Sequence, residues 1–185
     1  RSTLFPYTTL FRSASQNSNA AAVMKGIDCI IFPGGWDISP TLYYNEQPWH
    51  GIEVDSDYSA ERDVSDYLLF SYCLEKNIPT LAICRGMQML SIVSGAEIVQ
   101  DIPRWFAKVG VEYTYQHRDR RKKGFRAHGI DIMNQDSLLF GIVGRRRIEG
   151  CPSWHRQAVR SVDATRLVVT AVTDTNGIKV IEGIE

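Results

Sequence analysis

The sequence predicts an α/β fold that is built around a parallel sheet. Two short apolar runs, Ile27–Phe32 and Thr80–Cys84, are typical of strands that are buried on both faces. Between them, Asp63–Lys76 carries apolar residues at helical spacing. A strand, a helix and a second strand in this order form the crossover unit from which parallel sheets are built.

Length, composition and charge are those of an ordinary single domain. The chain has 185 residues, 44% of them hydrophobic, and its 21 basic side chains balance its 21 acidic ones. The basic stretches Arg118–Arg126 and Arg145–Arg147 lack regularly interleaved aromatic residues, so we expect solvated loops there and no nucleic-acid partner. No apolar run approaches the ~20 residues that span a bilayer, so we expect no membrane partner.

Two segments precede the expected domain, which covers residues 26–185. Residues 1–13 lack regular periodicity and the apolar core of a secretion signal, and we expect them to be a non-native tail. Residues 14–25 are small and polar, as in a linker or the remnant of a helix. Four cysteines without a secretion signal favour a reducing compartment, and therefore a cytoplasmic location.

The first long helix is expected to begin at Asp63, which is a suitable N-cap residue. Asp66 would then place a negative charge near the positive end of the helix dipole. Glu61 and Asp63 also invite an interpretation as catalytic carboxylates, but we favour helix capping and an ion pair with Arg62.

The rest of the chain predicts one more helix and several strands. A helix over Met87–Ser94 is closed by Gly95 and is followed by a short strand over Glu97–Gln100. Trp105–Gly124 is polar and irregular, and we expect a long surface loop there. Later strands and a hairpin turn are predicted at His128–Ile132, Leu167–Val172, Ile178–Ile184 and Asp174–Gly177.

The segment LAICRGMQ places Cys84 on a turn between a strand and a helix. Such a turn is typical of a nucleophile elbow, which lifts a reactive side chain to the carboxyl end of a strand. The helix N-terminus favours the thiolate, and the main-chain N–H of Arg85 can stabilise an oxyanion. Gly86 removes the side chain that would crowd the turn. We therefore expect Cys84 to be a nucleophile rather than an inert core cysteine.

A double-glycine turn follows the earlier strand. Gly34 and Gly35 let the backbone approach a ligand closely, and the N–H of Gly35 is a candidate second oxyanion donor. Taken alone, Pro-Gly-Gly is only a turn. Because a predicted elbow ends a neighbouring strand, we interpret the two turns together as the walls of one site.

The remaining cysteines and the histidines show no metal-binding pattern in the sequence. Cys29, Cys73 and Cys151 are interpreted as packing residues, and no C-x-x-C pair is present. No zinc-type spacing joins the four histidines, which are His50, His117, His128 and His155. We interpret His128 as a core residue and place His50 and His117 in polar loops. We expect neither a metal nor a cofactor.

Several segments together resemble the class I glutamine-amidotransferase-like family, and within it the γ-glutamyl-γ-aminobutyrate hydrolase branch. They match in order and spacing over nearly all of the chain after the tail, and they are FPGGWDISPTLY, ERD, ICRGMQ, QDIP and SWHRQAV. The resemblance implies a flavodoxin-like, three-layer α/β domain. It also implies cysteine-dependent hydrolysis of γ-glutamyl amides to glutamate and an amine. No cofactor is implied.

The resemblance also assigns roles to residues. It makes Cys84 the nucleophile and the main-chain amides of Gly35 and Arg85 the oxyanion hole. Gln88 matches a glutamine that lines the glutamyl pocket, and His155 becomes a pocket-wall or structural residue.

Two of these substrate-pocket roles have alternatives from the residues themselves. On chemistry alone, His155 is also the best internal candidate for a general base. Asp37 lies two residues after Gly35, where it can meet a substrate ammonium group or brace the loop.

The chain departs from the family pattern at several points. Ala82 replaces the first glycine of the elbow motif, and Arg156 stands where the family often has a second histidine. The family's His-Pro-Glu motif, which supplies the general base, is expected beyond Glu185, and its first strand and helix upstream of Gly26. We therefore expect an incomplete domain with little or no activity.

Three functions remain open at this stage. The first is the γ-glutamyl amide hydrolase of the resemblance, acting on a small molecule whose amine is γ-aminobutyrate, another polyamine-derived amine or ammonia. The second is the glutaminase domain of an amidotransferase, which passes ammonia to a partner domain. The third is a catalytically inactive binding module, with the basic loop as its contact surface. The sequence does not predict an oligomeric state.

Overall fold

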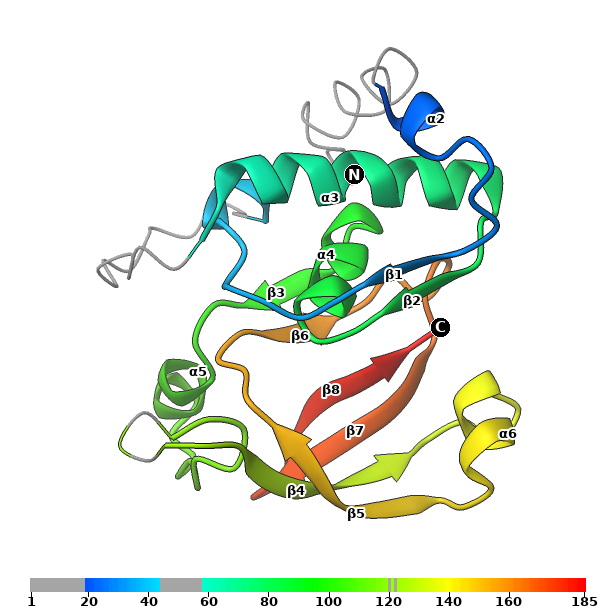
Figure 1. The fold of residues 1–185 in the computed structure, drawn as a ribbon. Coiled ribbons are helices and arrows are strands. Elements are labelled where there is room, and N and C mark those ends of the chain that lie inside the picture. The colour runs from blue at the N-terminus through cyan, green and yellow to red at the C-terminus, as the bar shows by residue number, and fades with distance from the viewer. Residues whose placement is uncertain (1–18, 44–57, 120, 122) are drawn as a thin grey trace. The chain divides into compact units, whose positions relative to one another are not determined.

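The computed structural model describes residues 19–43, 58–119, 121 and 123–185. These form two compact units, one up to Val93 and one over Ser94–Glu185 (Figure 1). The expected tail over residues 1–13 and the residue His50 lie outside the described residues. Of the expected linker, the described part includes the short helix α2, Ala20–Val23.

The first unit contains the predicted crossover. Strands β1 and β2 pair in parallel, with Ile30 opposite Thr80 and Phe32 opposite Ala82. The long helix α3 joins them, and α4 follows β2 after two residues. After α2, the elements of this unit are β1 (Ile30–Phe32), the 3-10 helix η1 (Pro40–Leu42), α3 (Ala60–Lys76), β2 (Thr80–Ala82) and α4 (Arg85–Val93).

Helix α3 begins earlier than predicted. Its N-cap is Ser59, whose hydroxyl accepts a hydrogen bond from the N–H of Arg62 at 3.3 Å. The prediction of an N-cap at Asp63 is therefore wrong, because Asp63 lies inside the helix and its carboxylate is used elsewhere. At the other end, Asn77 adopts a left-handed conformation with φ 53° and terminates the helix.

Helices α3 and α4 cover the same face of the β1–β2 pair (Figure 1). On that face the rings of Phe32 and Phe70 stack with their centroids 3.6 Å apart, and both side chains are buried. Side chains alternate along a strand, so Ile31 and Leu81 point the other way, and both are exposed. The expectation that these strands are buried on both faces is therefore wrong for the described structure.

The second unit is an antiparallel sheet of six strands in the order β3-β6-β8-β7-β4-β5. Among the described strands, parallel pairing is thus confined to β1 and β2. Short turns join neighbours such as β7 and β8, and a short turn permits only antiparallel pairing. The strands are β3 (Glu97–Val99), β4 (Arg126–Ile132), β5 (Arg147–Ser153), β6 (Ala158–Ser161), β7 (Val169–Thr175) and β8 (Ile178–Ile184).

The predicted hairpin between β7 and β8 is confirmed. Thr175 pairs with Ile178, and the two residues between them, Asn176 and Gly177, have φ of 50° and 84°. Two positive φ angles in a two-residue loop match the right-handed twist of the strands that the loop joins. The Asp174 carboxylate also accepts a hydrogen bond from the N–H of Gly177 at 2.8 Å.

The expected surface loop over Trp105–Gly124 is wrong in two respects. Helix α5, Ile102–Lys108, extends into it, capped by Asp101, which accepts from the N–H of Arg104 at 2.9 Å. Farther on, Tyr113 and His117 are buried, the former in a core with Phe106. Burial of these aromatic groups holds the segment against the second unit's sheet.

The sequence also missed β5, β6 and the helix α6, Leu138–Val143. Among the described residues, no helix has the length and apolarity to cross a bilayer.

Candidate active site

Cys84 occupies a strained turn between β2 and α4. Its φ is 53°, a left-handed conformation that side chains other than glycine rarely adopt, and the residue is exposed. Such a conformation costs on the order of 1–3 kcal/mol, and it persists only where the surroundings impose it. A strained, exposed thiol at the carboxyl end of a parallel strand is the arrangement of a nucleophile elbow.

Backbone hydrogen bonds fix this turn on both sides. The N–H of Ile83 donates to the carbonyl of Phe32 at 2.9 Å, which extends the β1–β2 pairing to the residue before the cysteine. The N–H of Gly86 donates to the carbonyl oxygen of Ile83 at 2.8 Å. The N–H of Gln88 donates to the carbonyl oxygen of Cys84 at 3.1 Å. Helix α4 therefore begins at the residue after Cys84, and a helix N-terminus favours negative charge.

Gly86 has no room for a side chain. A Cβ there would collide with the carbonyl oxygen of Phe32 and lie 2.9 Å from the Cβ of that residue. This confirms the expectation that the glycine prevents crowding at the turn.

The variant Gly86→Ala is expected to lower the free energy of unfolding by about 1–3 kcal/mol, because the backbone must shift to admit the methyl group. The matched control is Gly141→Ala in α6, where a Cβ meets nothing within 4 Å. That control is expected to be neutral or to stabilise by up to about 1 kcal/mol, because alanine favours helix. Urea denaturation of both variants measures the difference. Equal losses in the two variants would contradict the close approach of β1 and α4.

The double-glycine loop lies against the thiol. A Cβ built on Gly34 would sit 3.4 Å from the Cβ of Cys84 and 3.6 Å from its Sγ. The loop is held by Arg62, which donates to the carbonyls of Pro33 at 3.2 Å and Gly34 at 3.1 Å. A Cβ on Gly35 would collide with the Arg62 guanidinium. The structure thus brings the two predicted walls, Pro33–Gly35 and the elbow, into contact.

The side chain of Arg85 points into the protein. It is 2% exposed and forms ion pairs with Asp63 and Asp66 on α3. Asp63 also accepts a hydrogen bond from the N–H of Ser39 at 2.9 Å, so one carboxylate joins the loop after β1 to the elbow. Burial raises the pKa of Asp63, and the hydrogen bonds from Ser39 and Arg85 oppose that rise.

This arrangement corrects the predicted pairing of Arg62 with Asp63. Asp63 pairs with Arg85, and Arg62 pairs with Asp66 at 3.4 Å, one helical turn later. Because its guanidinium is engaged in the interior, Arg85 can serve the site only through its main-chain N–H.

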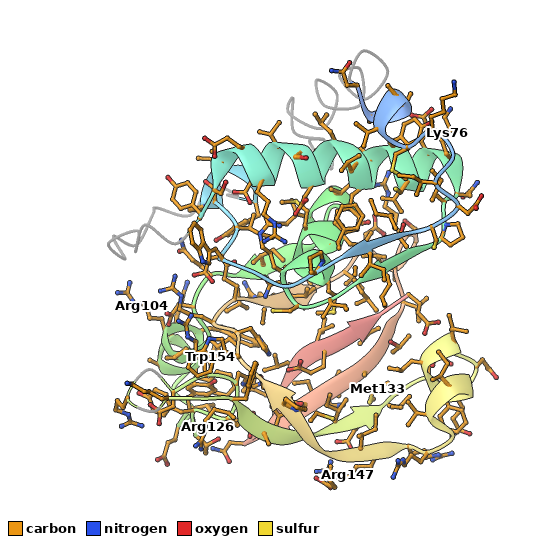
Figure 2. All side chains as sticks on the ribbon, in the orientation of Figure 1. Lys76, Arg104, Arg126, Met133, Arg147 and Trp154 are labelled. Carbon is orange, nitrogen blue, oxygen red and sulfur yellow. The ribbon has the colours of Figure 1, made fainter. Side chains whose placement is uncertain are left out.

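The substrate-pocket residues of the sequence prediction fall in both units. Gln88 lies in the first turn of α4 and is buried, and Asp37 is half-buried in the loop after Gly35. His155 belongs to the second unit, between β5 and β6, beside Trp154, which Figure 2 labels. The roles of these three residues toward a substrate stay predictions.

Three histidines and one glutamate come together in the second unit. His155 and His128 lie near Glu182 of β8, and so does His117, which is fully buried. His117 lies in a loop, as expected, but its side chain is buried there, and the core position of His128 on a strand is confirmed. Sequence reasoning missed Glu182, because the four residues are far apart along the chain and only the tertiary fold joins them.

The electrostatics of this group centre on Glu182. Burial alone would raise its pKa, but the neighbouring imidazoles of His117 and His155 lower it to about 2. Burial lowers the pKa of His117. Burial also opposes the charged form of His155, but the nearby Glu182 carboxylate outweighs it and raises the pKa of that imidazole.

Comparison with known proteins adds a family and a fold. The family described as Peptidase C26 matches residues 7–185. Protein NtpR of Enterococcus hirae is 33% identical over 174 residues, which cover 92% of this chain and 65% of that protein. The γ-glutamyl-γ-aminobutyrate hydrolase of Escherichia coli O157:H7 is 37% identical over 77 residues, covering 41% and 28%. The chain thus spans less than two thirds of either relative.

A solved structure supports the same fold. The glutaminase domain of Trypanosoma brucei CTPS with bound acivicin superimposes with a TM-score of 0.55 at 19% identity, covering 90% of this chain and 61% of that one. The fold is therefore the predicted α/β, flavodoxin-like class, with both parallel and antiparallel strands.

Proposed function

Because the chain belongs to the peptidase C26 family of class I glutamine-amidotransferase-like proteins, we propose that it hydrolyses γ-glutamyl amides through a thioester on Cys84. One observation carries the proposal: an exposed cysteine with φ of 53° stands on a strand-to-helix turn, with Gly34 against its sulfur. The partial likeness to a γ-glutamyl-γ-aminobutyrate hydrolase supports the substrate class.

The proposed reaction has two steps. The Cys84 thiolate attacks the γ-carbonyl carbon, a C–S bond forms, and the N–H groups of Gly35 and Arg85 stabilise the oxyanion. The C–N bond then breaks as the amine takes a proton. Water attacks the thioester, the C–S bond breaks, and glutamate leaves with the thiol restored. Gln88 and Asp37 are proposed to bind the glutamyl group.

Breaking the C–N bond of an amide requires a proton on the leaving amine. The resemblance assigns that proton to the histidine of a His-Pro-Glu motif, and the printed sequence contains no such motif. A substrate whose leaving group departs as a stable anion bypasses this requirement.

The test follows from that distinction. The chain is mixed with a γ-glutamyl thioester of thiophenol, and thiophenolate release is followed by absorbance. A burst of one equivalent followed by slower turnover is expected, and the α-glutamyl isomer should give no burst. Equal rates for the two isomers, or no release above the rate with free cysteine, would contradict the proposal.

A glutaminase domain that supplies ammonia is the second candidate, and the likeness to the glutaminase domain of T. brucei CTPS favours it. Competition separates the two candidates. Glutamine and γ-glutamyl-γ-aminobutyrate are each added to the thioester assay. Stronger inhibition by the aminobutyrate amide supports the hydrolase, whereas stronger inhibition by glutamine supports the glutaminase.

A further inference from the structure

The second unit contains a convergent group of side chains that the proposed reaction does not use. His117, His128, His155 and Glu182 form this group, which we name the His3Glu cluster. His128 lies on β4, Glu182 on β8, and the two others on connecting segments. One candidate ligand atom from each side chain lies within 4.8 Å of all the others. All four side chains are largely buried, and His117 and His128 almost completely.

The spacing of these atoms suits one small ion. Glu182 Oε1 lies 3.0 Å from His117 Nε2 and 3.9 Å from His128 Nε2, and Glu182 Oε2 lies 3.6 Å from His155 Nε2. Bonds of about 2.0–2.1 Å to a tetrahedral zinc ion place its ligand atoms roughly 3.3 Å apart. The three separations from the carboxylate bracket that value, and side-chain rotations that bring the four ligand atoms from within 4.8 Å to this spacing would complete the coordination.

In two of the imidazoles, a hydrogen bond at Nδ1 fixes the tautomer. It leaves a lone pair on Nε2, the nitrogen nearer the Glu182 carboxylate. The Nδ1 of His155 lies 2.9 Å from the carbonyl oxygen of Gln157, which can only accept, so Nδ1 carries the proton. The Nδ1 of His128 lies 2.8 Å from Thr173 Oγ1, and this hydroxyl donates in turn to the carbonyl of Gly129 at 2.9 Å. In both neutral rings Nε2 then carries an unprotonated lone pair. A histidine that binds a metal has the same arrangement, with its other ring nitrogen donating to an outer partner.

The inner atoms lack the hydrogen bonds that burial demands. Among the described residues, His117 Nε2, His128 Nε2 and Glu182 Oε1 are buried and make no hydrogen bond. His117 Nε2 and Glu182 Oε1 are 3.0 Å apart, the distance of an ion pair when the imidazole is protonated. A buried polar atom without a partner costs about 1–3 kcal/mol, and three such atoms around one point call for a shared partner.

We propose that the His3Glu cluster binds a divalent transition-metal ion, with zinc as the preferred ion. Imidazole and carboxylate ligands suit zinc, and four protein ligands leave no open position for a substrate. The site is therefore structural: it joins β4, β8 and two connecting segments of the second unit. This proposal is independent of the reaction at Cys84.

Metal stoichiometry and spectra test the proposal on the whole chain. The protein is stripped with a chelator, and Zn²⁺ or Co²⁺ is added. One equivalent of zinc should be retained after gel filtration, and Co²⁺ should give the intense visible bands of a tetrahedral complex. X-ray absorption at the zinc edge should show only nitrogen and oxygen neighbours, at about 2.0–2.1 Å. A sulfur shell at about 2.3 Å would place the metal on cysteines and overturn the proposal.

Variants assign the site to its residues. Glu182→Gln keeps the shape and removes the charge, and it should weaken zinc binding by at least about a hundred-fold. Glu149→Gln, an exposed carboxylate of the same unit, is the matched control and should bind zinc like the parent chain. Cys84→Ala should also bind normally. Far-UV circular dichroism checks that each variant is folded. Thr173→Val removes the hydrogen bond to His128 Nδ1, and its zinc affinity is measured as a second variant of the site. Unchanged zinc affinity in both Glu182→Gln and Thr173→Val, or less than half an equivalent in the parent chain, would overturn the proposal.

Discussion

Cys84→Ala is expected to abolish the thiophenolate burst from the γ-glutamyl thioester. Without the sulfur no acyl-enzyme can form, and in a complete catalytic triad the loss of the nucleophile costs about 10⁶ in kcat. In this chain the measurable effect is the disappearance of the one-equivalent burst. The matched control is Cys29→Ser, because Cys29 is also exposed and precedes β1 in the same unit.

Mass spectrometry provides the second observation for this prediction. The parent chain and the Cys29→Ser variant should each gain one glutamyl group during the burst, and the Cys84→Ala variant should gain none. A burst that persists in Cys84→Ala, or that is lost in Cys29→Ser, would assign the nucleophile to another residue.

Asp63→Ala is expected to cause the largest loss of stability in the first unit. It removes one of the two carboxylates that neutralise the buried Arg85 and also the acceptor for the N–H of Ser39. Breaking a buried ion pair from one side costs about 3–5 kcal/mol. Because Asp66 still pairs with Arg85, we expect a loss of about 3 kcal/mol, at the lower end of that range. Urea denaturation measures it.

Two further variants isolate the cause. Glu61→Ala changes an exposed carboxylate in the same helical turn and should alter the free energy of unfolding by no more than about 0.5 kcal/mol. The double variant Asp63→Leu with Arg85→Met replaces the pair by apolar groups and should recover most of the lost stability. A loss in the double variant as large as in Asp63→Ala would show that the uncompensated charge is not the cause.

The parts of the fold that depend on local signals were predictable from the sequence. The elbow was predicted because a strand, a cysteine, a glycine and a helix are consecutive along the chain. The β7–β8 hairpin was predicted because Asn176–Gly177 joins two apolar runs. Helix α5 was missed although Asp101 and Pro103 are start signals, because the polar residues after Trp105 outweighed them in the interpretation.

The parts that depend on tertiary contacts were not predictable. Asp63 is of a residue type that often caps helices, and it precedes the apolar helical pattern. Only the arrangement of α3 against α4 reveals that it neutralises Arg85. The His3Glu cluster needs the pairing of β4 and β8 with the strand β7 between them, and the position of two connecting segments, before its members meet. No periodicity or spacing encodes such a meeting, since the residues come from four separate stretches of sequence.

The most direct measurement is the alkylation rate of each cysteine by iodoacetamide at neutral pH, resolved by peptide mapping. Cys84 and Cys29 are both exposed, so accessibility does not distinguish them. We predict that Cys84 reacts faster than both Cys29 and free cysteine, and that a γ-glutamyl amide slows only Cys84. Equal rates at the two exposed cysteines, with no protection by the γ-glutamyl amide, would contradict a nucleophilic role for Cys84.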